Sequence, residues 1–315
     1  MTITEADFQK QLDLLKQEVP TRGVERYPLR LNDVSDLPAD LRSQAVDSGI
    51  DGETVRTIIA FPPQLQHGWQ YVSRQALLFT TKGVIHIQAS IWSDQEPEVT
   101  FLQGRDLMYM KVSLLLLYGH LEIVAQGPDS PTRIGVEFNT VGWQMLSRPL
   151  RRLLLESKPK DDESPEESVI HPALQDAVEE LPIKFSNGVQ IYGLLPGEVL
   201  QDLVFQPGLW KRWFLLFQRA VTPNMLLLLS SNYMVVIEEE LRTKHGWIVS
   251  HIPRSCIVGI RSRPGSLGID LTVELRRGSQ TVEYTLALQE EPARAWHQLW
   301  IEHGGRWQDH HDEVG

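Results

Sequence analysis

The sequence predicts a mainly β protein with some helix, built from two copies of one module of about seven strands and a closing helix. Three observations lead to this prediction. The chain has 315 residues, enough for about two domains. Short β-branched or aromatic runs, bounded by glycine, proline, asparagine or charge, recur along both halves. Similar phrases also follow one another in the same order in both halves, 144 to 154 positions apart.

The clearest repeat pairs residues 76–87 with residues 226–237, at an offset of 150 positions. Each segment has an apolar strand, a turn with two neighbouring hydroxyl residues, a polar tip and a second apolar strand. Three weaker matches flank this pair: 52–55 with 197–200, 27–31 with 181–185, and 136–138 with 282–284. Their fixed order argues against chance and favours a duplication.

The second copy shows the strand pattern most clearly. Leu271, Val273 and Leu275 alternate with polar residues, which is typical of a half-buried strand. We expect strands near residues 198–206, 225–230, 233–239, 246–252, 255–262, 268–276 and 280–288. The apolar stretch 214–237 is interrupted by Pro223 and Asn224, so we interpret it as two buried strands and not as a membrane span.

A helix is expected to close each copy. In the second copy, Ala293, Trp296 and Trp300 recur at helical spacing after Pro292, which a first turn tolerates. In the first copy Asn139 or Thr140 can cap a helix that contains Pro149. Its expected buried face is Val141, Met145, Leu146, Leu150, Leu153 and Leu154. Its last turns carry cations that complement the helix dipole: Arg148, Arg151 and Arg152.

The expected organisation has four parts. Residues 1–155 form an N-terminal module with a leading helical segment, and residues 181–303 form the C-terminal module. Residues 156–180 form an acidic flexible linker that holds −7 of the net charge of −11, with a short helix near 171–180. Residues 304–315 form a frayed tail.

Composition narrows the class of protein. The single cysteine, Cys256, rules out an intramolecular disulfide and fits a reducing compartment, and the first residues do not read as a secretory signal. We therefore expect a soluble, cytoplasmic protein. Both modules are close to neutral, which argues against a nucleic-acid partner.

No familiar catalytic motif occurs in the chain. We interpret Cys256 as a buried structural thiol, since it lies in an apolar strand. The histidines lack metal-ligand spacing, and the group His303, His310, His311 and Asp312 falls in the tail. We expect no enzyme activity, no cofactor and no metal.

The second half resembles the bacterial pleckstrin-homology-like (PH-like) domains. The resemblance rests on the Gly197-Glu198 opening, the hairpin 225–240, the phrase 245–257 and the closing helix with Trp296. It covers residues 195–303 well and 50–155 more loosely. It implies two PH-like partly open β-barrels, each with about seven strands and a C-terminal capping helix, that bind lipids, peptides or proteins.

The candidate ligand-binding residues lie between the first two strands of the second copy, where the resemblance implies a basic loop. Trp210, Lys211, Arg212 and Trp213, followed by Phe214, interleave aromatic and cationic side chains, as a membrane interface or an anionic peptide would require. Arg261 and Arg263 are expected to enlarge this patch. The alternative is a packed helix or extra strand whose cations face water.

Two binding functions and one enzymatic function remain open. The sequence favours a non-enzymatic adaptor that binds protein or peptide partners, because the acidic linker would be repelled by an anionic bilayer. The alternative is a peripheral module that binds anionic lipid through residues 210–214. An enzyme of unrecognised type ranks third.

Overall fold

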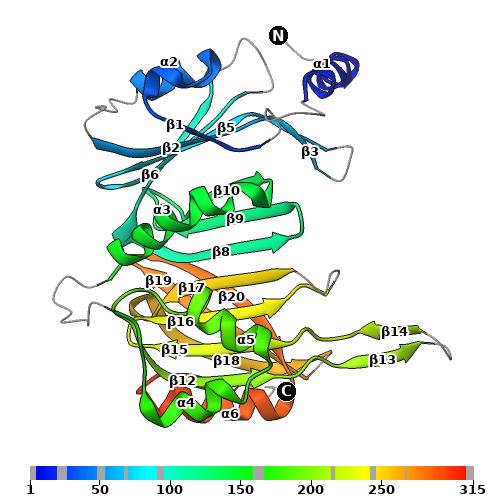
Figure 1. The fold of residues 1–315 in the computed structure, drawn as a ribbon, viewed down its shortest axis with the longest axis vertical. Coiled ribbons are helices and arrows are strands. Elements are labelled where there is room, and N and C mark those ends of the chain that lie inside the picture. Colours follow the sequence, from blue (N-terminus) through cyan, green and yellow to red (C-terminus); the bar gives the residue numbers. More distant parts are fainter. Residues whose placement is uncertain are drawn as a thin grey trace, which may run out of the picture. The chain divides into compact units, whose positions relative to one another are not determined.

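The computed structural model describes residues 5–19, 27–47, 54–66, 70–90, 96–158, 167–213, 217–241, 246–266 and 268–309 (Figure 1). They form two compact units. The first contains residues 1–105, 117–121 and 134–156, and the second contains 106–116, 122–133 and 157–315. The second unit therefore includes two segments from within the range 1–155 that we assigned to the N-terminal module.

The first unit is built on an antiparallel sheet in the order β1-β2-β5-β6-β7. Its strands are β1 (Leu29–Leu31), β2 (Val55–Phe61), β5 (Gln75–Thr80), β6 (Gly83–Gln88) and β7 (Glu98–Gln103). A separate hairpin joins β3 (Gln64–Gln66) to β4 (Gln70–Val72). The helices are α1 (Glu5–Glu18), η2 (Val34–Asp36), α2 (Ala39–Asp47), η5 (Thr140–Gly142) and α3 (Trp143–Glu156), and η4 (Gly104–Asp106) follows β7.

Two helices pack on opposite faces of this sheet (Figure 1). Leu41 of α2 packs in one apolar cluster with Ile58 of β2 and Leu78 of β5. The residues next to them, Thr57 and Phe79, point the other way because side chains alternate along a strand, and this second face contacts α3. The sheet thus has an α2 side and an α3 side.

An eight-stranded sheet has the order β10-β9-β8-β17-β16-β15-β12-β11. It is formed by β8 (Leu107–Leu115), β9 (Tyr118–Ala125), β10 (Thr132–Phe138), β11 (Val169–Ile170), β12 (Val199–Gln206), β15 (Met225–Ser230), β16 (Tyr233–Glu239) and β17 (Trp247–Pro253). Strands β8, β11, β12 and β15 to β17 lie in the second unit, whereas β9 and β10 divide their residues between the units.

The second unit also has a sheet in the order β20-β19-β18-β21. Its strands are β18 (Ile257–Gly265), β19 (Gly268–Arg277), β20 (Gln280–Leu288) and β21 (Trp307–Asp309). The hairpin of β13 (Trp210–Trp213) and β14 (Phe217–Ala220) forms a sheet of its own. The remaining elements are η6 (Pro172–Leu174), α4 (Gln175–Glu179), α5 (Ile183–Gly188), the π-helix η7 (Val189–Gly193), η8 (Arg254–Cys256) and α6 (Glu290–Glu302).

One core joins the two sheets of the second unit to α6. Leu227 and Val236 come from one sheet, Leu271 and Val273 come from the other, and Trp296 of α6 is fully buried among them. Burial of this apolar surface is the main stabilising contribution to the unit.

Strand β8 belongs to this unit because it pairs antiparallel with β17, with Leu114 opposite Trp247 and Met110 opposite His251. The segment that follows β9 is also hydrogen-bonded within the second unit, through Gly127. The Gln280 side-chain amide donates to Gly127 O at 2.9 Å and accepts from Gly127 N at 3.0 Å. Strands distant in sequence therefore complete one sheet.

The prediction of a mainly β class with helix is confirmed, and the seven strands expected in the second copy are present within a few residues of their expected ends. None of the sheets formed by the described residues closes into a barrel. The expected short helix near residues 171–180 is also present, as η6 and α4.

Two stretches have the same order of elements. From β2 to β10, and again from β12 to β20, the chain forms a strand, a short hairpin, three strands, a 3₁₀ turn and three further strands. A helix, α3 or α6, follows each series.

Two local expectations were wrong. Val141 is 59% exposed, because it lies in η5, ahead of the buried face of α3. The tail is ordered as far as β21, which pairs with β18 because Trp307 stacks on His297 and the Trp300 indole N–H donates to Arg306 O at 3.0 Å. The core of the expected flexible linker, residues 159–166, and the tail histidines lie outside the described residues.

Candidate anion-binding site

The structure places the residues that the sequence singled out on two different sheets of the second unit. Trp210, Lys211, Arg212 and Trp213 form strand β13, with Lys211 opposite Arg219 in the hairpin. Their side chains lie outside the described part of the structure, and so does Phe214. The backbone of this segment is therefore an extra strand, which was one of the alternatives that the sequence left open.

Arg261 and Arg263 lie on β18, and each pairs with a carboxylate of the same sheet. The Arg261 guanidinium pairs with Glu283, and Arg263 Nε lies 3.5 Å from the Asp270 carboxylate. These partners neutralise both cations locally, which weakens their expected part in a basic patch.

Cys256 is buried, as expected, and its thiol donates to Leu107 O at 3.2 Å. Burial raises the pKa of this thiol to about 11, so it is not a reactive nucleophile. Burial also lowers the pKa of His86 to about 4, which keeps the imidazole neutral.

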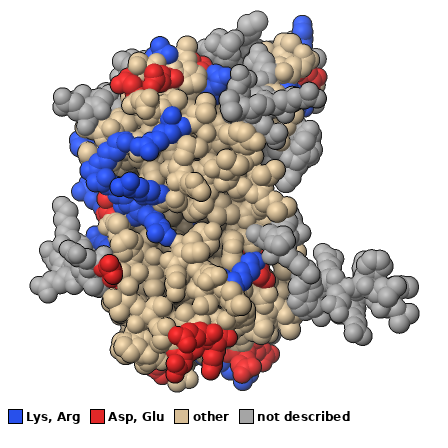
Figure 2. Space-filling view, viewed as in Figure 1, with Lys and Arg blue, Asp and Glu red and all other residues tan. Residues whose placement is uncertain are grey.

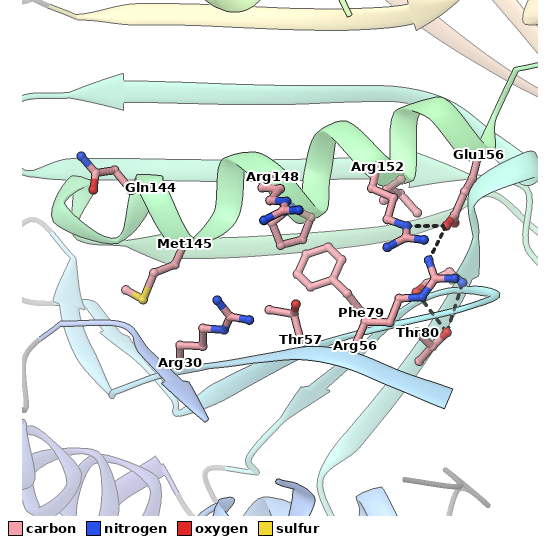
Figure 3. Close-up of a pocket in the computed structure, with 13 residues that line it drawn as sticks. Arg30, Arg56, Thr57, Phe79, Thr80, Gln144, Met145, Arg148, Arg152 and Glu156 are labelled. Carbon is pink, nitrogen blue, oxygen red and sulfur yellow. Dashed lines mark hydrogen bonds and ion pairs between the residues drawn. The ribbon is translucent and has the colours of Figure 1, made fainter. Parts of the chain in front are cut away.

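A cavity of about 530 Å³ lies in the first unit, between the α3 side of the sheet and α3 itself (Figure 3). All of its lining residues belong to this unit. They are Arg30, Arg56, Thr57, Phe79, Thr80, Gly83, Gln144, Met145, Arg148, Pro149, Arg152, Leu153 and Glu156. We call this cavity the arginine pocket, because four guanidinium groups line it.

The fold brings the four arginines together from three elements. Arg148 and Arg152 are one helical turn apart on α3, opposite the buried face of Leu146, Leu150 and Leu153. Arg30 comes from β1 and Arg56 from β2, which are neighbours in the sheet. In Figure 3 the side chains of Arg30 and Arg148 extend into the space between helix and strands.

Glu156, the last residue of α3, is the one acidic residue in the lining. Its carboxylate lies 3.5 Å from Arg56 Nη1 and 3.8 Å from Arg152 Nε. Burial raises its pKa, and the two arginines oppose that effect. Gly104 packs directly beside it: a Cβ there would lie 2.7 Å from Glu156 Cβ.

Most of the guanidinium donors in this pocket are weakly engaged. Charge-assisted N–H···O bonds are about 2.7–2.9 Å long, so both distances to Glu156 are loose. Elsewhere in the same unit, Arg74 Nη1 lies 3.0 Å from both oxygens of Asp40. Within the described residues, the side chains of Arg30 and Arg148 have no ion-pair or hydrogen-bond partner.

Apart from the polar side chains of Thr57 and Gln144, the rest of the lining is apolar or already hydrogen-bonded. Phe79, Met145, Pro149 and Leu153 supply apolar surface. The Thr80 hydroxyl donates to Gly83 O and accepts from Gly83 N, both at 3.2 Å, and so closes the β5–β6 turn. The pocket therefore combines a partly apolar wall with concentrated positive charge, and Figure 2 shows blue side chains gathered over the region where Figure 1 draws α3.

The sequence contained part of this site. Arg148 and Arg152 were interpreted as cations that complement the dipole of α3, yet their spacing, opposite a leucine face, also marks them as two cations on one exposed surface. Arg30 and Arg56 were missed, because only the pairing of β1 with β2 brings them to the same cavity.

No model of a known protein family matches the chain, and no curated protein matches it. Among the described residues, no helix combines the length and the apolarity needed to cross a bilayer.

Proposed function

We propose that the chain is a non-enzymatic adaptor that binds protein or peptide partners, and that its first unit holds an anionic group of the partner in the arginine pocket. The observation that carries this proposal is the set of four guanidinium groups around one cavity, opposed by a single carboxylate.

The chemistry of the lining favours an anion. Guanidinium groups present planar sets of donors that match carboxylate and phosphate oxygens, often in pairs of bonds. A volume of about 530 Å³ is typical of ligand sites, and the apolar wall of Phe79, Met145 and Leu153 offers surface for the rest of a bound peptide.

The same lining favours binding over catalysis. It contains neither histidine nor cysteine, and the Thr80 hydroxyl is engaged with the Gly83 backbone. A nucleophile needs an adjacent base to act on it. The other hydroxyl of the lining, that of Thr57, makes no hydrogen bond with Glu156, the one carboxylate there.

The order of elements supports a tandem origin. Two copies of a PH-like module, each a partly open barrel with a closing helix, would account for the same succession of strands from β2 to α3 and from β12 to α6. In this proposal β8, from the first copy, completes the sheet of the second copy through β17. Modules of this kind serve as binding platforms.

Fluorescence anisotropy with labelled peptides tests the function. We expect peptides rich in aspartate and glutamate, or carrying phosphoserine, to bind the full chain more tightly than glutamine-substituted versions. An Arg148→Gln, Arg152→Gln double variant should lose at least tenfold in affinity. Arg133→Gln, Arg294→Gln is the matched control, because both arginines are exposed, pair with glutamates and lie in the second unit. Equal losses of affinity in both double variants, or no binding of any anionic peptide, would reject the arginine pocket as the binding site.

A second candidate function is attachment to anionic lipid through the β13–β14 hairpin. The observation in its favour is that residues 210–213 and 217–220 form a two-stranded sheet separate from the others. Co-sedimentation with phosphatidylserine vesicles at low and physiological salt tests it. Salt-sensitive binding that a Lys211→Glu, Arg212→Glu variant abolishes would support it, and no binding at either salt would reject it.

A further inference from the structure

Glu156 occupies a position that does not favour a carboxylate. It is the C-terminal residue of α3, where the helix dipole favours cations, and its side chain is only 28% exposed. Burial alone destabilises its charged form. Arg56 and Arg152 are the cations that compensate, but at 3.5 and 3.8 Å they hold it loosely.

Glu156 and an incoming anion would use the same donors. Arg56 and Arg152 line the cavity in which a ligand would lie, and their closest acidic partner is Glu156. An anion bonded to either guanidinium at 2.7–2.9 Å would have shorter, stronger contacts than Glu156 has. Arg30 and Arg148, on the other side of the pocket, offer further donors to it.

We propose that the arginine pocket accepts a phosphoryl dianion, and that Glu156 is a built-in competitor that the dianion displaces from Arg56 and Arg152. The inference rests on the proposed function, since it names the ligand class and the regulation of the same pocket.

The charge balance favours a dianion over a carboxylate. Four guanidinium groups face one carboxylate, so a bound monoanion would leave most of the positive charge uncompensated. A phosphoryl group carries close to two negative charges at neutral pH and three acceptor oxygens, which allows it to accept from several arginines at once. A carboxylate has two oxygens and one charge, and Glu156 already shows how weakly one such group engages this pocket.

Titration calorimetry of the full chain with inorganic phosphate, sulfate and acetate, at constant ionic strength, tests the ligand class. Phosphate and sulfate should bind with dissociation constants at least tenfold lower than that of acetate. Equal affinity for acetate would overturn the assignment of a dianion.

Glu156→Gln tests the competition. This variant should bind phosphate at least tenfold more tightly than the unmodified chain, because the competing charge is removed while the shape is kept. Glu290→Gln, an exposed glutamate of α6 paired with Arg294, should stay within twofold. If Glu156→Gln fails to fold, Glu156→Asp withdraws the carboxylate from the arginines and should give a smaller gain. Unchanged or weaker phosphate binding by the folded variants would overturn the proposal that Glu156 competes with the anion.

A serine phosphopeptide, compared with its unphosphorylated form and with inorganic phosphate, distinguishes the source of the phosphoryl group. Tighter binding of the phosphopeptide than of phosphate supports a protein partner, whereas equal or weaker binding supports a small phosphorylated molecule. Binding of glutamate-rich peptides through Arg148 and Arg152 without any binding of phosphate or phosphopeptide would sink this inference and leave the proposed function intact. If the chain binds none of these anions, both this inference and the proposed function are wrong.

Discussion

The Ser230 hydroxyl donates a 2.7 Å hydrogen bond to the buried carboxylate of Glu198, which joins the start of β12 to the turn between β15 and β16. The same carboxylate accepts from the Ser231 hydroxyl at 3.0 Å and from Asn232 N at 2.9 Å, and it pairs with Lys158. Gly197, at φ +78°, makes the sharp turn that precedes it. The Gly-Glu and Ser-Ser phrases that suggested a repeat therefore belong, in the second copy, to one polar network.

Replacing Glu198 with alanine should destabilise the second unit by about 3–5 kcal/mol, because four donors, the Asn232 side-chain amide among them, and the Lys158 ammonium lose a buried partner. Glu198→Gln should cost less, since an amide oxygen still accepts. Glu290→Ala, on the exposed start of α6, should cost about 0.5 kcal/mol or less. Urea unfolding followed by tryptophan fluorescence measures the three values, and similar losses in all three would contradict the network.

Cutting the chain within the expected linker should not separate the two fragments. Residues 106–116 and 122–133 belong to the second unit, and β8 pairs with β17, so the N-terminal fragment contributes a strand to the C-terminal one. A protease site inserted within residues 159–166 allows a clean cut. In native buffer the cut chain should elute from gel filtration at the volume of the intact chain, whereas in concentrated guanidinium it should elute later than the intact unfolded chain, because the two half-length fragments then separate. Elution of the cut chain at the volume of a half-length protein in native buffer would favour independent modules divided near residue 155.

The Cys256 thiol should be unreactive in the folded chain. With a pKa of about 11, on the order of one thiol in a thousand is ionised at pH 8, and the sulfur is buried. Ellman's reagent should modify it at least a hundredfold more slowly in native buffer than in urea. Comparable rates in the two conditions would mean that the strand region around Cys256 opens readily.

His86 should make the first unit sensitive to acid. Its folded-state pKa of about 4 lies below the ordinary value of about 6.5, so the unfolded chain takes up a proton first as pH falls. Above pH 6.5 this histidine leaves the free energy of unfolding unchanged. As the pH falls to 4 and below, it lowers the free energy of unfolding by about 3 kcal/mol in total. Urea unfolding at pH 7.5 and 4.5 should show a smaller loss for His86→Gln than for the unmodified chain. The same loss in both would exclude His86 as the cause.

The sequence predicted what local patterns encode. Alternation and turn chemistry predicted β15, β16 and β19, and helical spacing predicted α6, because each depends on residues close together in the chain. The side hairpin of β13 and β14 was only one of two alternatives. The pairing of β8 with β17 was missed because it joins strands roughly 130 residues apart, and no periodicity reports such a partner.

The candidate site was harder to predict for the same reason. We selected residues 210–213 because aromatic and basic residues are neighbours in the sequence there. That pattern does not show whether the folded chain forms a pocket around them. The four arginines of the arginine pocket come one from β1, one from β2 and two from α3, and its acidic residue, Glu156, stood at the edge of the expected linker. Only the folded chain brings Arg56 and Glu156 together, from positions 100 apart.

The late pairing of β8 has a consequence during translation. The ribosome completes β8 roughly 140 residues before it completes β17, which takes about 7 to 28 seconds at 5–20 residues per second. For that time the nascent chain carries an apolar strand edge, from Leu107 to Leu115, whose final neighbour does not yet exist. An open edge of this kind pairs readily with other strands. We therefore expect mispairing of this chain to be most frequent on crowded polysomes, and a chaperone that covers nascent strands to reduce it there.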